Sequence, residues 1–300
     1  MSDSPAHTPV MLRAVVELLR PERAPRIADC TVGLGGHAEA LLERQAPDGT
    51  YLAIDLDAEN LRRARRRLKR FDDGRRVRWF HADYADLPEV LAAAGVERLE
   101  GLLADLGVAS TQFDEAQRGF SFAADAPLDM RLNVEGSGPT AAELVNRLDE
   151  RALADLLYHN ADEHRSRRIA RAIVEARRRK PIERTVELAE IVQRALGGRR
   201  GARIHPATRT FQALRIAVNR ELESLDRLLS ALPEVLTSGG RAAIISFHSQ
   251  EDRRVKHAFS AMESAGTGRI ITPKPVVADD EEVRANPRSR SAKLRCVERT

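Results

Sequence analysis

The stretch ADCTVGLGGHAEALL, residues 28–42, decides the fold of this chain. An apolar run ends in a turn that contains Gly33, Gly35 and Gly36, and a helical pattern begins directly after it. No lysine follows the glycines, because His37 stands there, and the G-x-G-G spacing differs from the G-x-G-x-x-G of dinucleotide-binding sites. The stretch therefore predicts a strand, a glycine turn and a helix start whose ligand needs no lysine.

Other strand-like runs alternate with helical patterns along the chain. The helical patterns include residues 38–45 and 59–71, and in the second of these arginines fill the face opposite the apolar one. Strands separated by helices indicate right-handed βαβ units and a parallel sheet. The strand-like runs are 26–31, 50–56, 76–84, 99–108 and 241–249, followed by 268–277 and 292–299 near the C-terminus.

A long interval separates the fourth run from the fifth, and it is longer than one crossover needs. We expect a discontinuous sheet domain over 1–111 and 209–300, with a mostly helical insertion over 112–208. The interval carries amphipathic helical patterns at 140–159, 165–179, 185–196 and 211–236, the last leading back to the sheet.

An acid ends the second strand-like run. Asp55 lies 22 residues after Gly33, where a carboxylate can accept hydrogen bonds from both ribose hydroxyls of a nucleoside. Asp57 is the competing candidate, and a solvated loop acid is the alternative without function. We prefer Asp55 because it is nearer to the glycine turn.

The next two strand ends complete a candidate pocket. Asp83 or Tyr84 stands where an adenine could rest, and Asp105 stands at the mouth of the site. Ligands of open α/β sheets bind beyond the carboxyl ends of the strands. A nucleoside with one ribose and no phosphates fits this arrangement, which predicts S-adenosylmethionine. A nicotinamide cofactor would favour the fuller glycine fingerprint.

Composition limits the class of protein. Forty-nine basic and 45 acidic residues give a formal charge of +4, and 44 of the basic residues are arginine, as a GC-rich genome alone would produce. Basic residues gather in 160–181, with eight against three acids, and in 284–300, with six against one. These clusters suit RNA phosphates, although a solvated helix face is the alternative for each.

Several classes are disfavoured. Cys30 and Cys296 are too few for a disulfide framework or a zinc site, and the sequence offers no candidate metal ligands. No apolar run approaches the roughly 18 residues of a membrane span, and no secretory signal is visible, so we expect a cytoplasmic protein.

Longer motifs run through the whole chain: HTPVM (7–11), DCTVGLGGH (29–37), DLGVASTQFD (105–114), RGFSF (118–122), PLDMR (127–131), HPATRTFQALRIAVNREL (205–222), ISFHSQEDRRVK (245–256) and NPRSRSAKLR (286–295). They resemble the ribosomal small-subunit methyltransferase H family, also called RsmH or MraW. The resemblance implies a Rossmann-like class I S-adenosylmethionine-dependent methyltransferase with a helical insertion. It implies methylation of the N4 of a cytidine in the decoding region of bacterial 16S ribosomal RNA, within the small subunit.

The resemblance also assigns a cofactor site and RNA contacts. It favours Arg209, Arg288 and Arg290 among the basic residues as RNA contacts. Ala109, Gln250 and residues 160–170 depart from its motifs. The last of these lies in the insertion, so the resemblance supports the cofactor contacts more strongly than the substrate contacts there. The cofactor positions that it implies are Gly35, Gly36, His37, Asp55, Tyr84, Asp105 and Gln112.

Methyl transfer to an exocyclic amine calls for an acceptor of its proton. Asp105 is the first candidate and His248, in SFHS, is the second. A cofactor-holding role for Asp105 and a structural role for His248 remain alternatives. The rival functions are a methyltransferase acting on another RNA or DNA, and a non-catalytic ribosome-assembly factor that binds RNA.

Overall fold

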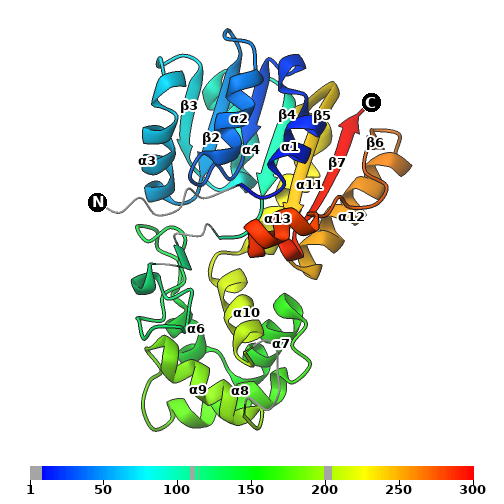
Figure 1. Cartoon of the computed structure of the whole chain (residues 1–300). Coiled ribbons are helices and arrows are strands. Elements are labelled where there is room, and N and C mark those ends of the chain that lie inside the picture. The colour runs from blue at the N-terminus through cyan, green and yellow to red at the C-terminus, as the bar shows by residue number, and fades with distance from the viewer. Residues whose placement is uncertain (1–8, 109–111, 114, 199–204) are drawn as a thin grey trace. The chain divides into compact units, whose positions relative to one another are not determined.

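The computed structural model describes residues 9–108, 112–113, 115–198 and 205–300 (Figure 1). They divide into two compact units. Unit 1 falls within Met1–Gly107 and Glu223–Thr300, and unit 2 falls within Val108–Leu222. No helix in the described part of the chain is both long and apolar enough to span a membrane.

Unit 1 is built on a sheet that has seven strands among the described residues, in the order β3-β2-β1-β4-β5-β7-β6. The first five pair in parallel, and β7 runs antiparallel to both β5 and β6. The strand order reverses at β1 and β4, where open α/β sheets bind their ligands. The strands are β1 (Arg26–Asp29), β2 (Thr50–Asp55), β3 (Val77–His81), β4 (Leu99–Asp105), β5 (Leu236–Ser246), β6 (Gly268–Ile270) and β7 (Lys293–Arg299).

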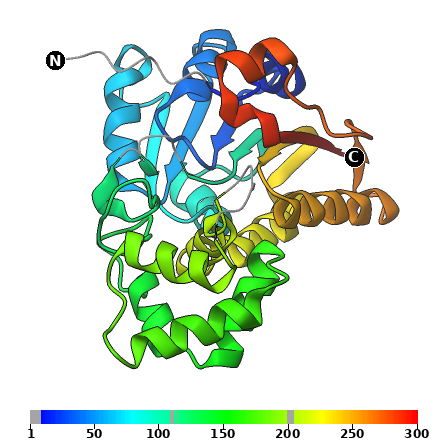
Figure 2. The same ribbon diagram turned by 60° about the horizontal axis from the view of Figure 1, so that its bottom comes forward.

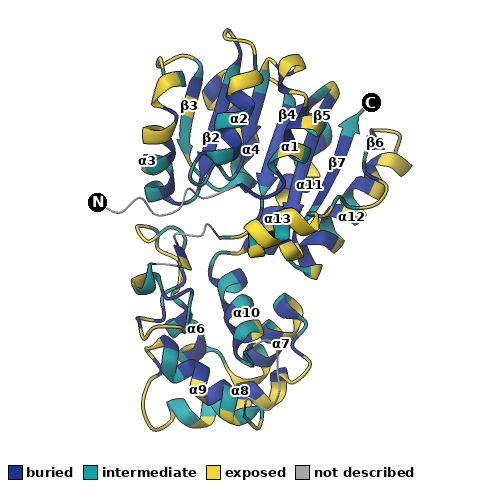
Figure 3. Cartoon of the chain, in the orientation of Figure 1, coloured by how far each residue is buried: buried dark blue, intermediate teal, exposed yellow. Residues whose placement is uncertain are grey.

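Two apolar cores lie on the two faces of this sheet, because successive side chains of a strand point to opposite faces. On β4, Leu102 and Ala104 belong to one core and Leu103 belongs to the other. The first core packs against α4 (Leu87–Ala94), α11 (Glu221–Val235) and α12 (Ser249–Ser264). The second packs against α1 (Leu12–Leu19), α2 (Gly36–Arg44) and α3 (Ala58–Arg67). Figure 3 shows the central strands buried beneath these helices.

Unit 2 is helical and has its own core. Its helices, green to yellow in Figure 2, pack against one another. Thr140 and Glu143 form a capping box that starts the first of them, and Asp149 caps the second. The helices are α6 (Ala141–Arg147), α7 (Glu150–Ala161), α8 (Ser166–Arg177), α9 (Thr185–Ala195) and α10 (Thr208–Val218).

The predicted fold class is confirmed, as an α/β sheet with a helical insertion. Three elements differ from the prediction, one of them the pattern at 140–159, which forms the two helices α6 and α7. The sheet is mixed, because the C-terminal β7 inserts antiparallel beside β5. The pattern at 211–236 forms two helices, because Arg220 takes a left-handed φ of 52° between α10 and α11.

Unit 2, Val108–Leu222, extends beyond both ends of the range 112–208 expected for the insertion. Phe211 and Leu214 of α10 belong to the core of unit 2, so that helix packs with the insertion and not with the sheet. An amphipathic stripe predicts that a helix is packed but does not name its partner.

Candidate active site

Glycine shapes the turn after β1. Gly33 and Gly35 have φ values of +53° and +79°, a left-handed conformation that residues with a Cβ rarely adopt. The N–H of Gly33 donates to Oδ2 of Asp55 at 2.8 Å, and Gly35 is the N-cap of α2. The turn therefore joins the ends of β1 and β2 and presents a helix start at the point where the strand order reverses.

Gly36 and His37 lie against the N-terminal segment. A Cβ on Gly36 would lie 2.4 Å from Cγ of Pro9, so only glycine allows this approach. The ring of His37 is buried, with Nε2 2.8 Å from the carbonyl oxygen of Val10 and Nδ1 3.8 Å from Oδ2 of Asp105. In a neutral ring Nε2 is then the protonated nitrogen. The Gly-Gly-His sequence thus ties three segments together at this end of the sheet.

Asp55 is held by backbone and side-chain donors. Besides Gly33, it accepts the N–H of Asp57 at 2.8 Å and Nδ2 of Asn60 at 3.3 Å. Burial raises the pKa of Asp55 to about 6, because the charged form loses hydration. A carboxylate has about four acceptor sites and three donors already use Asp55, so a further bond to a ribose hydroxyl can be added. Asp57, the competing candidate, instead caps α3 by accepting the N–H of Glu59 at 2.9 Å.

The end of β3 offers an aromatic ring. Tyr84 begins the short 3₁₀ helix η3 (Tyr84–Asp86) and packs half-buried against the first core. Asp83 accepts the N–H of Ala85 at 2.9 Å and the hydroxyl of Ser224 at 2.6 Å. Asp83 therefore anchors the local backbone, and Tyr84 is the group suited to stack on a base.

Asp105 ends β4 in a protected place. Its N–H donates to Oγ1 of Thr31 at 2.7 Å, and its Oδ1 is buried with no hydrogen-bond partner among the described residues. Burial, together with the neighbouring carboxyl groups of Asp29 and Glu251, raises the pKa of Asp105 well above its usual range. A cation beside this carboxyl would reverse that effect and favour its ionised form.

Asp29, the last residue of β1, received no role from the sequence. It is buried and accepts the hydroxyl of Tyr51 at 3.0 Å and the N–H of Thr31 at 3.2 Å. Burial raises its pKa to about 7, and the nearby Asp55 adds to the shift. The sequence did contain a signal for Asp29, because it ends an apolar strand beside the glycine turn, just as Asp55 ends the next strand.

The strand order brings these acids to one edge of the sheet. Strands β2, β1, β4 and β5 are consecutive neighbours. Their ends carry Asp55, Asp29, Asp105 and, just beyond β5, Glu251, which we name the carboxylate row. Buried like charges repel, as the raised pKa values of Asp29 and Asp105 reflect. The row therefore favours a cationic ligand and disfavours the diphosphate of a nicotinamide dinucleotide.

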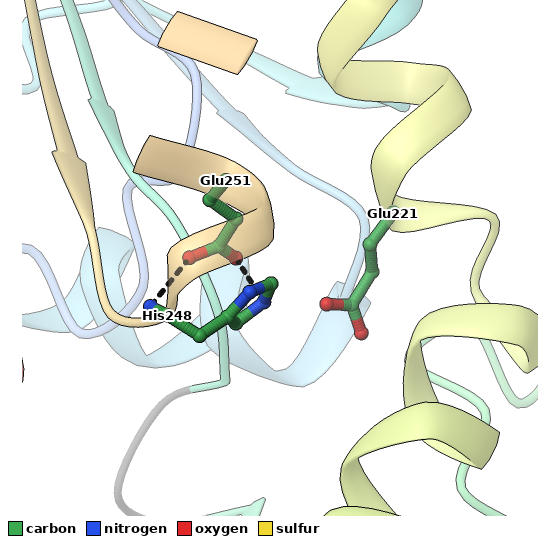
Figure 4. A group of neighbouring side chains, drawn as sticks. All are labelled: Glu221, His248 and Glu251. Carbon is green, nitrogen blue, oxygen red and sulfur yellow. Dashed lines mark hydrogen bonds and ion pairs between the residues drawn. The ribbon is translucent and has the colours of Figure 1, made fainter. Parts of the chain in front are cut away.

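His248 and Glu251 form a pair beyond β5 (Figure 4). Nε2 of His248 lies 3.0 Å from Oε1 of Glu251, whose side chain is only 3% exposed. Oε2 of Glu251 accepts the N–H groups of Phe247 at 2.8 Å and His248 at 3.4 Å. An acid three residues into a helix is the signal of a capping box, and it could have singled out Glu251 from the sequence.

The predicted site residues separate into two groups. Unit 1 holds Gly35, Gly36, His37, Asp55, Tyr84, Asp105 and His248, whereas Gln112 belongs to unit 2. The departure at Ala109 lies outside the described residues.

The C-terminal basic cluster is only partly available to RNA. Arg295 is buried and its Nε donates to Asp252 at 2.7 Å, and Lys293 donates to the same carboxylate at 3.0 Å. Arg288 and Arg290 are exposed on the 3₁₀ helix η5 (Pro287–Ser291). Ion pairing inside the protein thus removes two of the six basic residues from the predicted RNA-binding set.

Comparisons with known proteins agree with this geometry. The family model described as the MraW methylase family matches residues 4–300. Proteins named ribosomal RNA small subunit methyltransferase H are similar to the chain throughout. That of Syntrophobacter fumaroxidans is 48% identical, covering 100% of this chain and 98% of its own. That of a Cyanothece species is also 48% identical, covering 98% and 94%. The relative from Acidobacterium capsulatum is 45% identical, covering 98% of each chain. This chain belongs to the MraW methylase family.

Proposed function

We propose that the protein transfers a methyl group from S-adenosylmethionine to the N4 of a cytidine in the decoding region of 16S ribosomal RNA, in the cytoplasm where small subunits assemble. The observation that carries the proposal is the carboxylate row beside the glycine turn, in a chain whose relatives are named for ribosomal RNA methylation. The buried Oδ1 of Asp105, which no described donor satisfies, fits a cationic cofactor.

The cofactor would be held by groups at the ends of four strands. Asp55 takes the ribose hydroxyls and Tyr84 stacks on the adenine. The glycine turn at Gly35 and Gly36 leaves space for the amino-acid portion, beside Asp105. When bound, S-adenosylmethionine supplies a methyl group activated by its sulfonium charge. The residues of this chain then contribute orientation and electrostatic stabilisation.

Cytosine N4 is a weak nucleophile because its lone pair is delocalised into the ring. An acceptor for an N4 hydrogen helps the nitrogen to become tetrahedral and to lose a proton. Asp105 is our first candidate for this acceptor, because burial raises the pKa of its carboxyl group, and the carboxylate is then a stronger base than an exposed one.

His248 is the second candidate, with Glu251 as the residue that positions it. When the Nε2–H of the neutral ring points to Glu251, the lone pair is on Nδ1, which can accept a proton. The carboxylate then stabilises the imidazolium that forms, as in other carboxylate–histidine pairs. Glu251 also accepts the backbone N–H of His248, so that one buried carboxylate orients both the backbone and the ring of His248.

The RNA would be bound through phosphates by basic residues in both units. In unit 2 these are the exposed arginines of α8 and Arg209 of α10, and in unit 1 they are Arg288 and Arg290. We propose residues 112–208 as the substrate-recognition domain. Sequence-specific RNA enzymes act on unpaired, splayed bases, and the decoding-region cytidine would be presented in this way.

Methyl transfer from labelled S-adenosylmethionine tests the proposal. The acceptors are naked 16S RNA and 30S particles, both from a strain that lacks the enzyme, and the product is identified by nucleoside analysis. We expect label in N4-methylcytidine. Label in another nucleoside would favour a different RNA target. Cofactor binding without label in either acceptor would favour a non-catalytic assembly factor.

A further inference from the structure

A short segment of unit 1 carries more positive charge than either of the basic clusters at 160–181 and 284–300. Residues 58–78 contain ten basic and three acidic residues, a formal charge of +7, whereas the whole chain has +4. The remainder of the chain is therefore net negative. A uniform preference for arginine codons would spread arginine along the chain and would not produce this contrast.

The fold places most of these basic residues on one exposed surface. Helix α3 packs through Ala64, whose Cα lies 3.4 Å from the position of a Cβ on Gly35, and through the buried Leu68. The opposite face of α3 and the neighbouring edge strand β3 point away from the core (Figures 1 and 3). We name the exposed basic residues of this helix face and of the segment that follows it the α3 surface: Arg62, Arg65, Arg66, Arg67, Lys69, Arg70 and Arg75.

Carboxylates on this surface are shared among several arginines. Glu59 pairs with Arg62 at 2.8 Å and also lies 3.8 Å from Arg66, and Glu39 pairs with both Arg67 at 2.8 Å and Arg70 at 3.1 Å. Exposed pairs of this kind are worth at most about 1 kcal/mol each. The acids therefore order the arginines without neutralising them.

Other members of the surface have no acidic partner. Lys69 and Arg75 have no carboxylate within ion-pair distance among the residues that the structure describes. Aromatic rings support the surface from beneath, since the guanidinium of Arg65 lies 5.3 Å from the ring centre of Trp79. Arg70 and Arg76 stack on Phe71 at 4.7 and 5.4 Å. The stacked guanidiniums also donate within the protein, Arg65 to Asp72, Arg70 to Glu39, and Arg76 to the carbonyl oxygens of Leu42 and Gln45, so rings and acceptors together hold them in place.

We propose that the α3 surface binds the phosphate backbone of the RNA substrate beside the methylation site, an inference that rests on the proposed function. Helix α3 begins directly after Asp55 and Asp57, at the cofactor end of the sheet. Together α3 and the 3₁₀ helix η2 (Lys69–Phe71) extend roughly 20 Å from that end. A strand of RNA lying along this length would meet several cationic groups in succession, and arginine suits phosphate through its paired donors.

The test is RNA binding by the full chain without cofactor, measured against a decoding-region RNA fragment over a range of salt concentrations. The variant is the triple substitution Arg66→Gln, Lys69→Gln and Arg75→Gln, whose side chains are exposed and support no buried contact. We expect about a 10-fold loss of affinity, and a salt slope reduced by about two, because each lost contact with single-stranded RNA removes about 0.7.

The matched control removes the same charge elsewhere in unit 1, by Arg13→Gln, Arg23→Gln and Lys274→Gln, which are also exposed. If both triple variants lose equal affinity, net charge alone acts and the proposal fails. It also fails if the α3 variant keeps the wild-type salt slope. Binding to phosphatidylglycerol vesicles is measured in parallel, and a variant that loses vesicle binding while its RNA affinity is unchanged would assign the surface to a membrane and overturn the proposal.

Cofactor affinity, measured by calorimetry on the same α3 variant, should stay at the wild-type value, which shows that the fold is intact. Because RNA binding is measured without methyl transfer, a chain that binds RNA through this surface but methylates no cytidine would overturn the proposed function and leave the surface in place.

Discussion

The carboxylate row and the α3 surface are neighbours in unit 1, yet they handle charge in opposite ways. In the row, Asp29, Asp55 and Asp105 are largely withdrawn from water and have raised pKa values. On the α3 surface, arginines share carboxylates in water and Lys69 has no acidic partner among the described residues. Electrostatic interactions are strong where the dielectric is low and weak where solvent screens them.

This contrast indicates where a single substitution should have a large effect on activity or binding. A buried carboxyl that loses its charge or its bonds changes the site at once, whereas exposed basic residues act in small increments that add. The following substitutions and measurements are arranged by the size of effect that this comparison predicts.

Asp105→Asn should have the largest effect. We expect methyl transfer to fall about 100- to 1,000-fold, the range for loss of a preorganised electrostatic group, and by more than cofactor affinity falls. Single-turnover kinetics beside calorimetry measure the two losses. Asp48→Asn, an exposed acid, is the control. Equal losses in the two measurements would limit Asp105 to holding the cofactor.

Asp55→Ala should weaken cofactor binding by about 10- to 100-fold, because charged hydrogen bonds are lost to the ribose and to Gly33. Calorimetry with S-adenosylmethionine measures the effect. The control is Asp57→Ala, which removes the cap of α3 and should lower the free energy of unfolding with little change in affinity. An unchanged affinity in Asp55→Ala would remove Asp55 from the ribose site.

Glu251→Gln keeps the size of the side chain but removes its charge from His248. We expect kcat to fall about 10-fold and its pH profile to move, because the imidazolium is no longer stabilised. Cofactor affinity should fall by less than kcat, because Glu251 is only one of the four acids in the carboxylate row. A uniform loss of kcat with the wild-type pH profile would leave Glu251 as a structural cap only.

Cofactor affinity should rise several-fold between about pH 5 and pH 8. The pKa values of Asp55, about 6, and Asp29, about 7, lie above their unfolded values, so a cationic ligand releases protons when it binds. Because the folded state binds these protons more tightly than the unfolded state, the two groups contribute fully to the free energy of unfolding near pH 4. This contribution is lost as pH rises through 6 to 7. Calorimetry in buffers of different ionisation enthalpy counts the protons, and an affinity independent of pH would contradict the electrostatic role of the row.

Lys69→Gln alone should lower RNA affinity by only about two- to fivefold at low salt, since one phosphate contact is lost. A loss as large as that of the α3 triple variant would mean that one residue dominates, and the additive behaviour expected of an exposed surface would be wrong. Fluorescence anisotropy with the decoding-region fragment is sensitive enough for the comparison.

Features that depend on neighbouring residues along the chain could be predicted from the sequence. Glycines at 33 and 35 mark a turn because only they adopt its backbone without strain, and apolar runs ending in Asp55 and Asp105 mark strand ends. These patterns, with motifs that span the chain, sufficed for the fold class and the family. The antiparallel β7 and the break at Arg220 depended on long-range packing and were missed.

Which charged groups lie close together depends on the tertiary structure and could not be predicted from the sequence. Asp29 and Asp105 are far apart in sequence and become neighbours because β1 pairs with β4, and Glu251 joins them because β4 pairs with β5. Arg295, which sequence counted as basic surface, is neutralised by Asp252. A pKa or a surface potential depends on distance and burial, and these arise from strand pairing and helix packing that no local pattern encodes.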